Sequence, residues 1–147
     1  MSKPNLRLET FLPYRLSFIS NLMGQALAKL YTDKFGISHT EWRVMAVLGV
    51  SSGVSAAYVA DKTAMDKVAV SRAIKNMIEN GLISRNFADE DKRRSELCLS
   101  ELGIDTYAKI APLVQEYEKG VLDSLDQAEQ DELDKLLSKL TNYINPE

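Results

Sequence analysis

Hydrophobic residues recur at spacings of three and four along most of the chain. From Leu12 to Lys34 they form one broad stripe, which predicts a long helix that Gly36 would end. The same spacing predicts helices over residues 40–50, 55–62 and 67–80, another that starts at Glu101, and a last one after Asp126. Pro112 is expected to kink or restart the fifth helix. The chain is therefore predicted to be mainly helical.

Capping residues and a break in the helical pattern refine this prediction. Ser38 and Glu41 have the Ser-x-x-Glu form of a capping box, and Asp66 stands where a helix N-cap belongs. Between residues 82–87 and 96–100, two short strand candidates flank a charged stretch, which predicts a hairpin with a long loop. Six helices with a small β-hairpin wing after the fourth form a winged helix-turn-helix.

Composition excludes several classes of protein. One cysteine and one histidine in 147 residues allow neither a disulfide nor a cysteine or histidine metal cluster, and they offer no credible catalytic set. We therefore expect no metal, no other cofactor and no enzymatic activity. The longest apolar run is seven residues, too short to cross a membrane, and the N-terminus carries too many charges for a secretory signal. These features favour a soluble cytoplasmic protein.

Charge is distributed unevenly along the chain. The formal net charge is −3, but residues 62–95 carry +3 and residues 96–147 carry −8. Such asymmetry indicates a lobe that binds a polyanion, although an ordinary solvated surface would also account for it.

The predicted helix over residues 67–80 carries the strongest candidate chemistry. One face is apolar and should pack on the core, while the opposite face is cationic and polar, with apolar groups in its first turn. Arginine can read a guanine edge, and small apolar side chains can contact thymine methyl groups. The candidate DNA contacts are Lys67, Val68, Ala69, Ser71, Arg72, Lys75 and Asn76. An amphipathic surface helix without a ligand would have a similar composition.

The predicted hairpin tip adds a second group of candidate contacts. Three consecutive cations follow three acidic residues there, and an arginine on a thin ribbon fits the narrow minor groove of DNA. The alternative is a charged turn that keeps an edge strand soluble. The candidate wing contacts are Asp91, Lys92, Arg93 and Arg94.

Four motifs in this order resemble the MarR family of bacterial transcriptional regulators. They are Asp66-Lys67-Val68-Ala69-Val70-Ser71-Arg72, Ile78-Glu79-Asn80-Gly81-Leu82-Ile83-Ser84-Arg85, Asp91-Lys92-Arg93 and Leu97-Cys98-Leu99-Ser100. The resemblance runs from about Leu12 to Ile144. It implies one MarR-type domain over residues 1–147, with a winged-helix lobe over 37–100 and a helical dimerisation region over 1–36 and 101–147.

The resemblance also implies partners. It implies a homodimer that binds a palindromic double-stranded DNA operator, most often as a repressor, and the wide apolar stripes of the terminal helices agree with a dimer. Family members commonly release DNA when a small molecule, often phenolic or aromatic, binds between the dimer helices and the DNA-binding lobe. By position, its pocket would be lined by Phe18, Met23, His39 and Trp42. The alternative is a winged-helix protein-interaction module without sequence-specific DNA binding.

Overall fold

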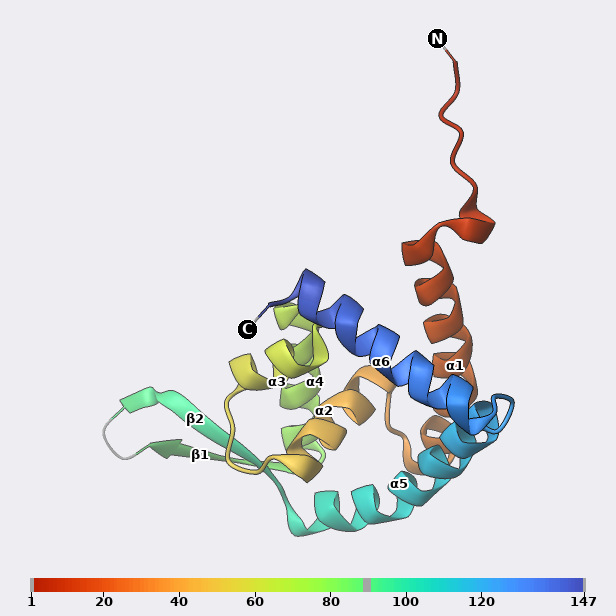
Figure 1. Ribbon diagram of the computed structural model, residues 1–147. Coiled ribbons are helices and arrows are strands. Elements are labelled where there is room, and N and C mark those ends of the chain that lie inside the picture. Colours follow the sequence, from red (N-terminus) through yellow and green to blue (C-terminus); the bar gives the residue numbers. More distant parts are fainter. Residues whose placement is uncertain (1, 89–90, 147) are drawn as a thin grey trace. The chain divides into compact units, whose positions relative to one another are not determined.

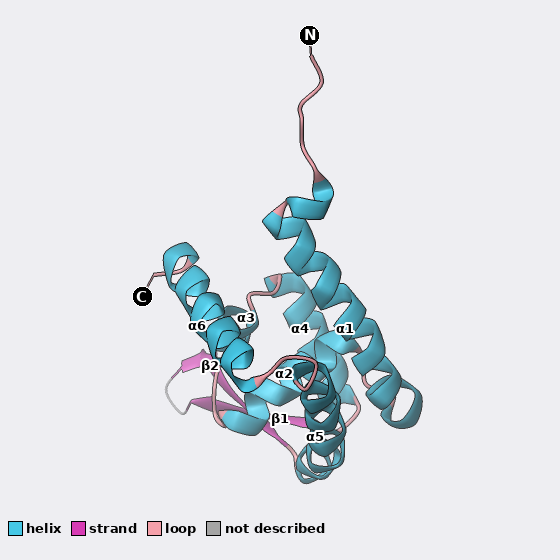
Figure 2. Cartoon of the chain, turned by 45° about the vertical axis from the view of Figure 1, so that its right-hand side comes forward, coloured by secondary structure: helices cyan, strands magenta, loops and turns pink. Residues whose placement is uncertain are grey.

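The computed structural model describes residues 2–88 and 91–146, and the side chains of residues 87, 88 and 91–94 lie outside that description. These residues form a short 3-10 helix, six α-helices and an antiparallel hairpin, which confirms the predicted fold class (Figures 1 and 2). The elements are η1 (Leu8–Thr10), α1 (Leu12–Phe35), α2 (His39–Val50), α3 (Ala56–Thr63), α4 (Lys67–Glu79), β1 (Ile83–Ala88), β2 (Asp91–Leu99), α5 (Glu101–Leu122) and α6 (Gln127–Ile144).

The helix starts follow local side-chain chemistry. The predicted capping box is present: the Ser38 hydroxyl accepts from the Glu41 backbone N–H, and the Glu41 carboxylate accepts from the Ser38 N–H. Asp66 caps α4, and Asp126 forms a second capping box at α6. Each cap satisfies backbone donors that a helix start would otherwise leave unpaired.

Residues 1–111 form one compact unit with α2 at its centre. Helix α2 packs against α1, α3, α4 and β2, and α4 also packs against β1. Apolar side chains from these elements and from the first part of α5 meet in one core, whose burial drives this part of the fold. The fully buried members with the largest side chains are Tyr31, Met45, Ile74, Met77, Leu97 and Ile110.

The hairpin differs from the prediction in the extent of its second strand. Residues 91–95 were expected in a loop, but β2 begins at Asp91, and Ala88 pairs with Asp91 after a register shift beyond Phe87. A polar sequence can continue a strand because the hydrogen bonds between neighbouring strands are made by backbone N–H and C=O groups. Leu97 also exchanges backbone hydrogen bonds with Val54 in the loop before α3, and this bridge anchors the wing to the helices.

Residues 112–147 form the second unit, made of the end of α5 and of α6. The prediction that Pro112 could restart the helix is wrong, because α5 is one helix that runs through it. Proline removes a single backbone hydrogen bond, and the turns on either side are long enough to hold the helix.

Helix α6 has no buried residue, and its apolar positions are exposed in the described chain: Leu133, Leu136, Leu137, Leu140 and Ile144. No helix in residues 2–88 and 91–146 is long and apolar enough to cross a bilayer.

Candidate nucleic-acid interface

Helices α3 and α4 are joined by a tight turn that fixes how α4 is presented. Ala64 ends α3 in the left-handed conformation, with φ of 53°, and its N–H bonds back to the last turn of that helix. Two residues later the Asp66 carboxylate accepts from the Ala69 N–H at 3.0 Å and starts α4. The left-handed residue and the cap together reverse the chain within three residues, as a helix-turn-helix requires.

Helix α4 has one buried and one exposed face. Val70, Ala73, Ile74 and Met77 are buried in the core, as the helical spacing predicted. On the opposite face, exposed side chains line a shallow concavity of about 320 Å³: Lys67, Val68, Ser71, Arg72 and Lys75. The structure thus brings five of the seven candidate contacts of this helix onto one accessible surface.

The concavity combines cationic and apolar groups. Two lysines and an arginine surround Val68, a valine that is 56% exposed. An exposed valine gains nothing from packing, but it can meet a thymine methyl group while the adjacent cations meet phosphates and guanine edges.

Two other candidates on α4 are placed differently. Ala69 is half-buried at the first turn, where its N–H binds the Asp66 cap. Asn76 is exposed overall, but its side-chain amide donates to the Glu41 carboxylate at 2.8 Å. Asn76 therefore already has a partner inside the protein, which no local sequence pattern indicated.

The wing extends from the base of the helical lobe (Figure 1). The four predicted wing contacts belong to the start of β2, and only their backbone is described. They are Asp91, Lys92, Arg93 and Arg94. On β1, Arg85 is exposed and pairs with Leu97 through the ladder, so it adds a cation to the described part of the wing.

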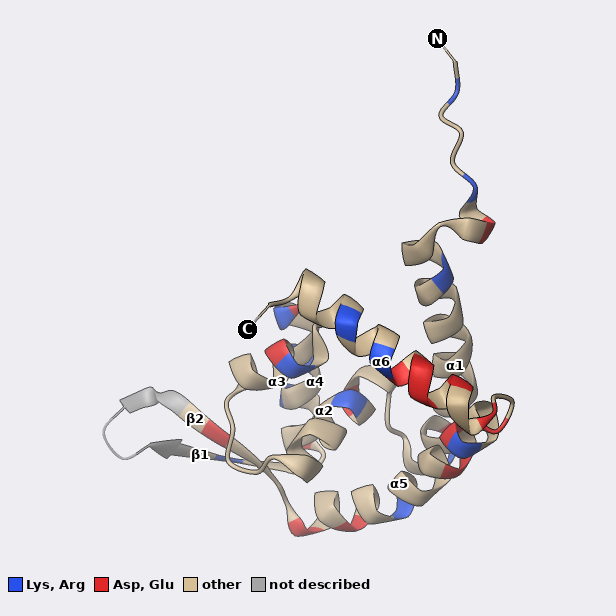
Figure 3. Cartoon of the chain, in the orientation of Figure 1, with Lys and Arg blue, Asp and Glu red and all other residues tan. Residues whose placement is uncertain are grey.

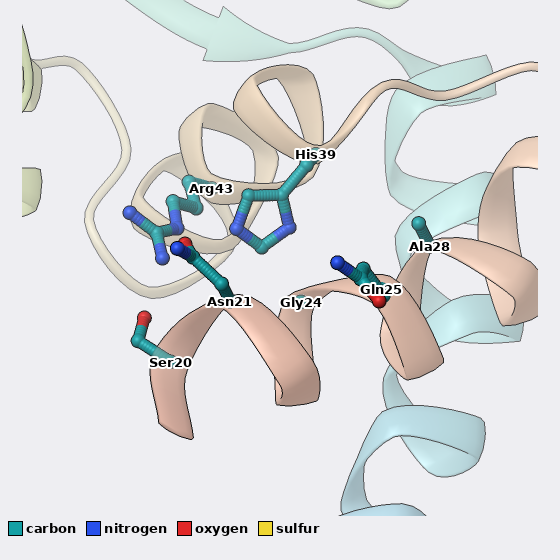
Figure 4. Close-up of a pocket in the computed structure, with 7 residues that line it drawn as sticks. All are labelled: Ser20, Asn21, Gly24, Gln25, Ala28, His39 and Arg43. Atoms are coloured by element: carbon teal, nitrogen blue, oxygen red, sulfur yellow. The ribbon is translucent and has the colours of Figure 1, made fainter. Parts of the chain in front are cut away.

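A second concave site lies between α1 and α2, with a volume of about 520 Å³ (Figure 4). In Figure 4, His39 and Arg43 project from α2 toward a row of small and polar residues on α1. The lining residues are Ser20, Asn21, Gly24, Gln25, Ala28, His39 and Arg43. A sequence signal was available, because small residues recur at every fourth position of α1 (Ser20, Gly24 and Ala28) and His39 and Arg43 are one turn apart on α2.

Of the four residues expected to line an effector pocket, His39 alone lines this cavity. Phe18 is exposed and stacks on Tyr14, and Met23 is half-buried beside the cavity-lining residues of α1. Trp42 stacks between Tyr31 and Tyr107. Aromatic stacking of this kind is packing that stabilises the core.

A buried tyrosine holds the His39 ring. The Tyr31 hydroxyl lies 2.6 Å from His39 Nδ1, and the two rings stack. Burial lowers the pKa of His39 below its ordinary value of 6.5, and the nearby Arg43 charge lowers it further. Burial also raises the pKa of Tyr31, so the hydroxyl keeps its proton and can donate it to Nδ1. In that arrangement the imidazole is neutral and carries its proton on Nε2.

The lowered pKa of His39 predicts a stability that depends on pH. Above about pH 6.5 the imidazole is neutral in folded and unfolded chains alike, so the interactions of neutral His39 contribute fully to the stability of the folded state. As the pH falls below that value, the unfolded chain takes up the proton more readily, and the folded state loses stability. Thermal unfolding of wild type and His39→Gln, measured from pH 8 to pH 5, should show a steeper decline for wild type. Parallel curves would contradict the assignment.

Charge differs between the two units. Acidic residues gather around the end of α5 and the first turns of α6, whereas α4 presents lysine and arginine (Figure 3). A protein with a net negative charge can therefore still present a cationic surface locally.

The chain is similar to known transcriptional regulators in sequence and in fold. A sequence model of the MarR family matches residues 35–94. The HTH-type transcriptional regulator BilQ of Clostridium symbiosum is 31% identical over 108 residues, which cover 74% of this chain and 75% of BilQ.

Solved structures agree with this match. The crystal structure of a MarR/EmrR family transcriptional regulator from Acinetobacter sp. ADP1 has a TM-score of 0.88 and 33% identity, with 97% of this chain and 100% of that chain covered. The structure of the S. aureus MepR–DNA complex shares the fold, with a TM-score of 0.81, 21% identity, and coverage of 90% and 98%. The chain therefore belongs to the MarR family, whose members are winged-helix transcriptional regulators and not enzymes.

Proposed function

We propose that this chain is a homodimeric, sequence-specific DNA-binding repressor that a small molecule releases from its operator. The observation that carries the DNA-binding part is the exposed concavity of α4, in which cationic and methyl-bearing side chains lie together on the face opposite the core. The MepR structure, of the same fold, is a complex with DNA, which supports the proposal. A repressor acts where the chromosome is, so we place the protein in the cytoplasm.

Each residue of the interface has a proposed role. Arg72 reads a guanine edge in the major groove, and Val68 and Ala69 contact thymine methyl groups. Lys67 and Lys75 bind phosphates, and the Ser71 hydroxyl binds a base edge or a phosphate. In the wing, Arg93 enters the minor groove, Asp91 orients it, and Lys92 and Arg94 add positive charge near the backbone.

The proposed interface can be tested by selecting bound fragments from a random DNA pool. We expect enrichment of a palindromic sequence, because two recognition helices of a two-fold dimer lie about 34–36 Å apart and read equivalent half-sites. Recovery of unrelated fragments at low ionic strength would instead favour the protein-interaction module.

The proposed dimer rests on apolar surface that one chain leaves exposed. On α1, Leu12, Leu16, Ile19 and Leu22 are all more than 40% exposed, and they follow helical spacing. The leucines of α6 form a second such stripe. Monomeric proteins rarely expose long contiguous apolar surfaces, and a second copy would bury them.

Light scattering should therefore give a mass twice that of one chain at micromolar concentration. Leu137→Glu places a charge in the α6 stripe and should shift the protein toward a monomer, since a buried unpaired charge opposes association. Lys135→Glu, on the opposite side of the same helix, is the matched control and should stay dimeric. A monomeric wild type would contradict the proposal.

The proposed effector site is the cavity between α1 and α2. Arg43 supplies a positive charge and His39 a ring N–H, a combination that suits an anionic ligand such as an aromatic carboxylate. Repeating the DNA selection with a panel of aromatic acids tests this part of the proposal. An acid that binds there should lower DNA affinity in wild type but not in Arg43→Ala.

A further inference from the structure

Glu41 is a buried carboxylate whose two oxygens serve different helices. Its side chain is only 6% exposed, on the first turn of α2. One oxygen, Oε1, accepts from the Ser38 N–H at 3.0 Å and completes the capping box. A capping box needs only this one oxygen.

The second oxygen reaches the recognition helix. Oε2 accepts from the Asn76 side-chain amide at 2.8 Å, although the two residues are 35 positions apart in the sequence. A hydrogen bond to a buried carboxylate is strong, and leaving that carboxylate without its partner is costly. The Glu41–Asn76 bond therefore joins the start of α2 to the last turns of α4.

Asn76 lies beside the DNA-facing surface of α4. It follows Lys75 directly and is four residues, about one turn, after Arg72. Rotation of α4 about its axis would move Asn76 and Arg72 together, because both belong to one rigid helix. A bond that fixes Asn76 to the core therefore also fixes the direction in which Arg72 points.

We infer that Glu41 and Asn76 are positioning residues for DNA recognition, and that Asn76 is not itself a DNA contact. The inference rests on the proposed function of α4. The bond holds the exposed face of α4 at one rotation relative to α2, so that every base contact made by that helix depends on it. Without the bond the same cations still reach phosphates, and binding without sequence preference persists.

A double-mutant cycle tests this inference. The variants are Glu41→Met, Asn76→Leu and the pair together, and the readout is the affinity for the selected duplex divided by that for a shuffled duplex. The first change keeps nearly the length of glutamate but removes both acceptor oxygens, and the second keeps nearly the shape of asparagine but removes its amide. We expect each single change to lower the ratio by about tenfold, and the pair to lower it no further, because both remove the same bond.

A second readout applies to Asn76→Leu alone, in case Glu41→Met does not fold. Each single-base substitution across the selected site should change the affinity of this variant less than it changes the affinity of wild type, because the whole of α4 is less well oriented. Relaxation at one base pair only would instead identify Asn76 as a base contact, and a lower salt dependence would identify it as a phosphate contact. Glu79→Gln, on an exposed position of the same helix, is the control and should keep the wild-type ratio.

The outcomes separate this inference from the proposal on which it rests. A wild type with no sequence preference overturns both. A wild type with a clear preference, combined with single effects that multiply in the double variant or with an unchanged ratio in Asn76→Leu, overturns the positioning role alone.

Discussion

Arg72→Ala should lower the preference for the selected duplex over a shuffled one by about 5- to 150-fold, corresponding to about 1–3 kcal/mol of discrimination per bidentate base contact. Arg72 is exposed on the face of α4 that lies opposite its buried residues. Its removal takes away hydrogen bonds to a base edge but leaves the core untouched, so unfolding of the protein should be unchanged. Fluorescence anisotropy with both duplexes at one salt concentration measures the effect.

Lys75→Ala is the matched control for this prediction. Lys75 lines the same concavity and is also exposed, but we assign it to the phosphate backbone. Its loss should weaken binding to both duplexes alike. A plot of log affinity against log salt concentration should become shallower by about 0.9, the contribution of one phosphate contact. If the two alanine variants have the same effect on both duplexes, the division between base-reading and phosphate-binding residues is wrong.

Gly103→Ala should destabilise the first unit by about 1–3 kcal/mol or more, the usual cost of forcing a group into filled space. A methyl group at this position of α5 would overlap the backbone carbonyl oxygen of Leu82 and press on the Leu99 side chain. Backbone atoms at the base of the wing cannot move aside as a flexible side chain can. For a chain of this length the unfolding midpoint should fall by roughly 2–12 °C.

Gly120→Ala provides the contrast on the same helix. Nothing in the described part of the chain lies within 4 Å of the position that its methyl group would occupy. Alanine favours the helix by about 0.5–1 kcal/mol over glycine, so this variant should be slightly more stable than wild type. Equal stability of both alanine variants would contradict the close packing of α5 against the wing.

Local sequence signals predicted the helices and the exposed face of α4 well. The capping residues Ser38, Glu41 and Asp66 act within three or four positions of themselves, and helical spacing separates the two faces of α4 without knowledge of the rest of the chain. Such features depend only on residues that are close together in the chain, so they can be predicted from the sequence.

The features that the sequence did not reveal join distant segments. The Val54–Leu97 bridge, the Glu41–Asn76 bond and the cavity between α1 and α2 each depend on how elements pack in three dimensions. Asn76 shows the consequence, because its place on α4 suggests a DNA contact whereas its amide is bound to Glu41. Periodicity identifies which residues are exposed, but not which of these already have a partner from another helix.

The central claim is that the exposed surface of α4 recognises DNA by sequence. Titration of wild type with the selected and shuffled duplexes, over a series of salt concentrations, tests it most directly. The account predicts tighter binding to the selected duplex at every concentration, and a logarithmic slope near −0.9 for each phosphate neutralised. Equal affinity for both duplexes, or no binding at the lowest salt, would contradict it.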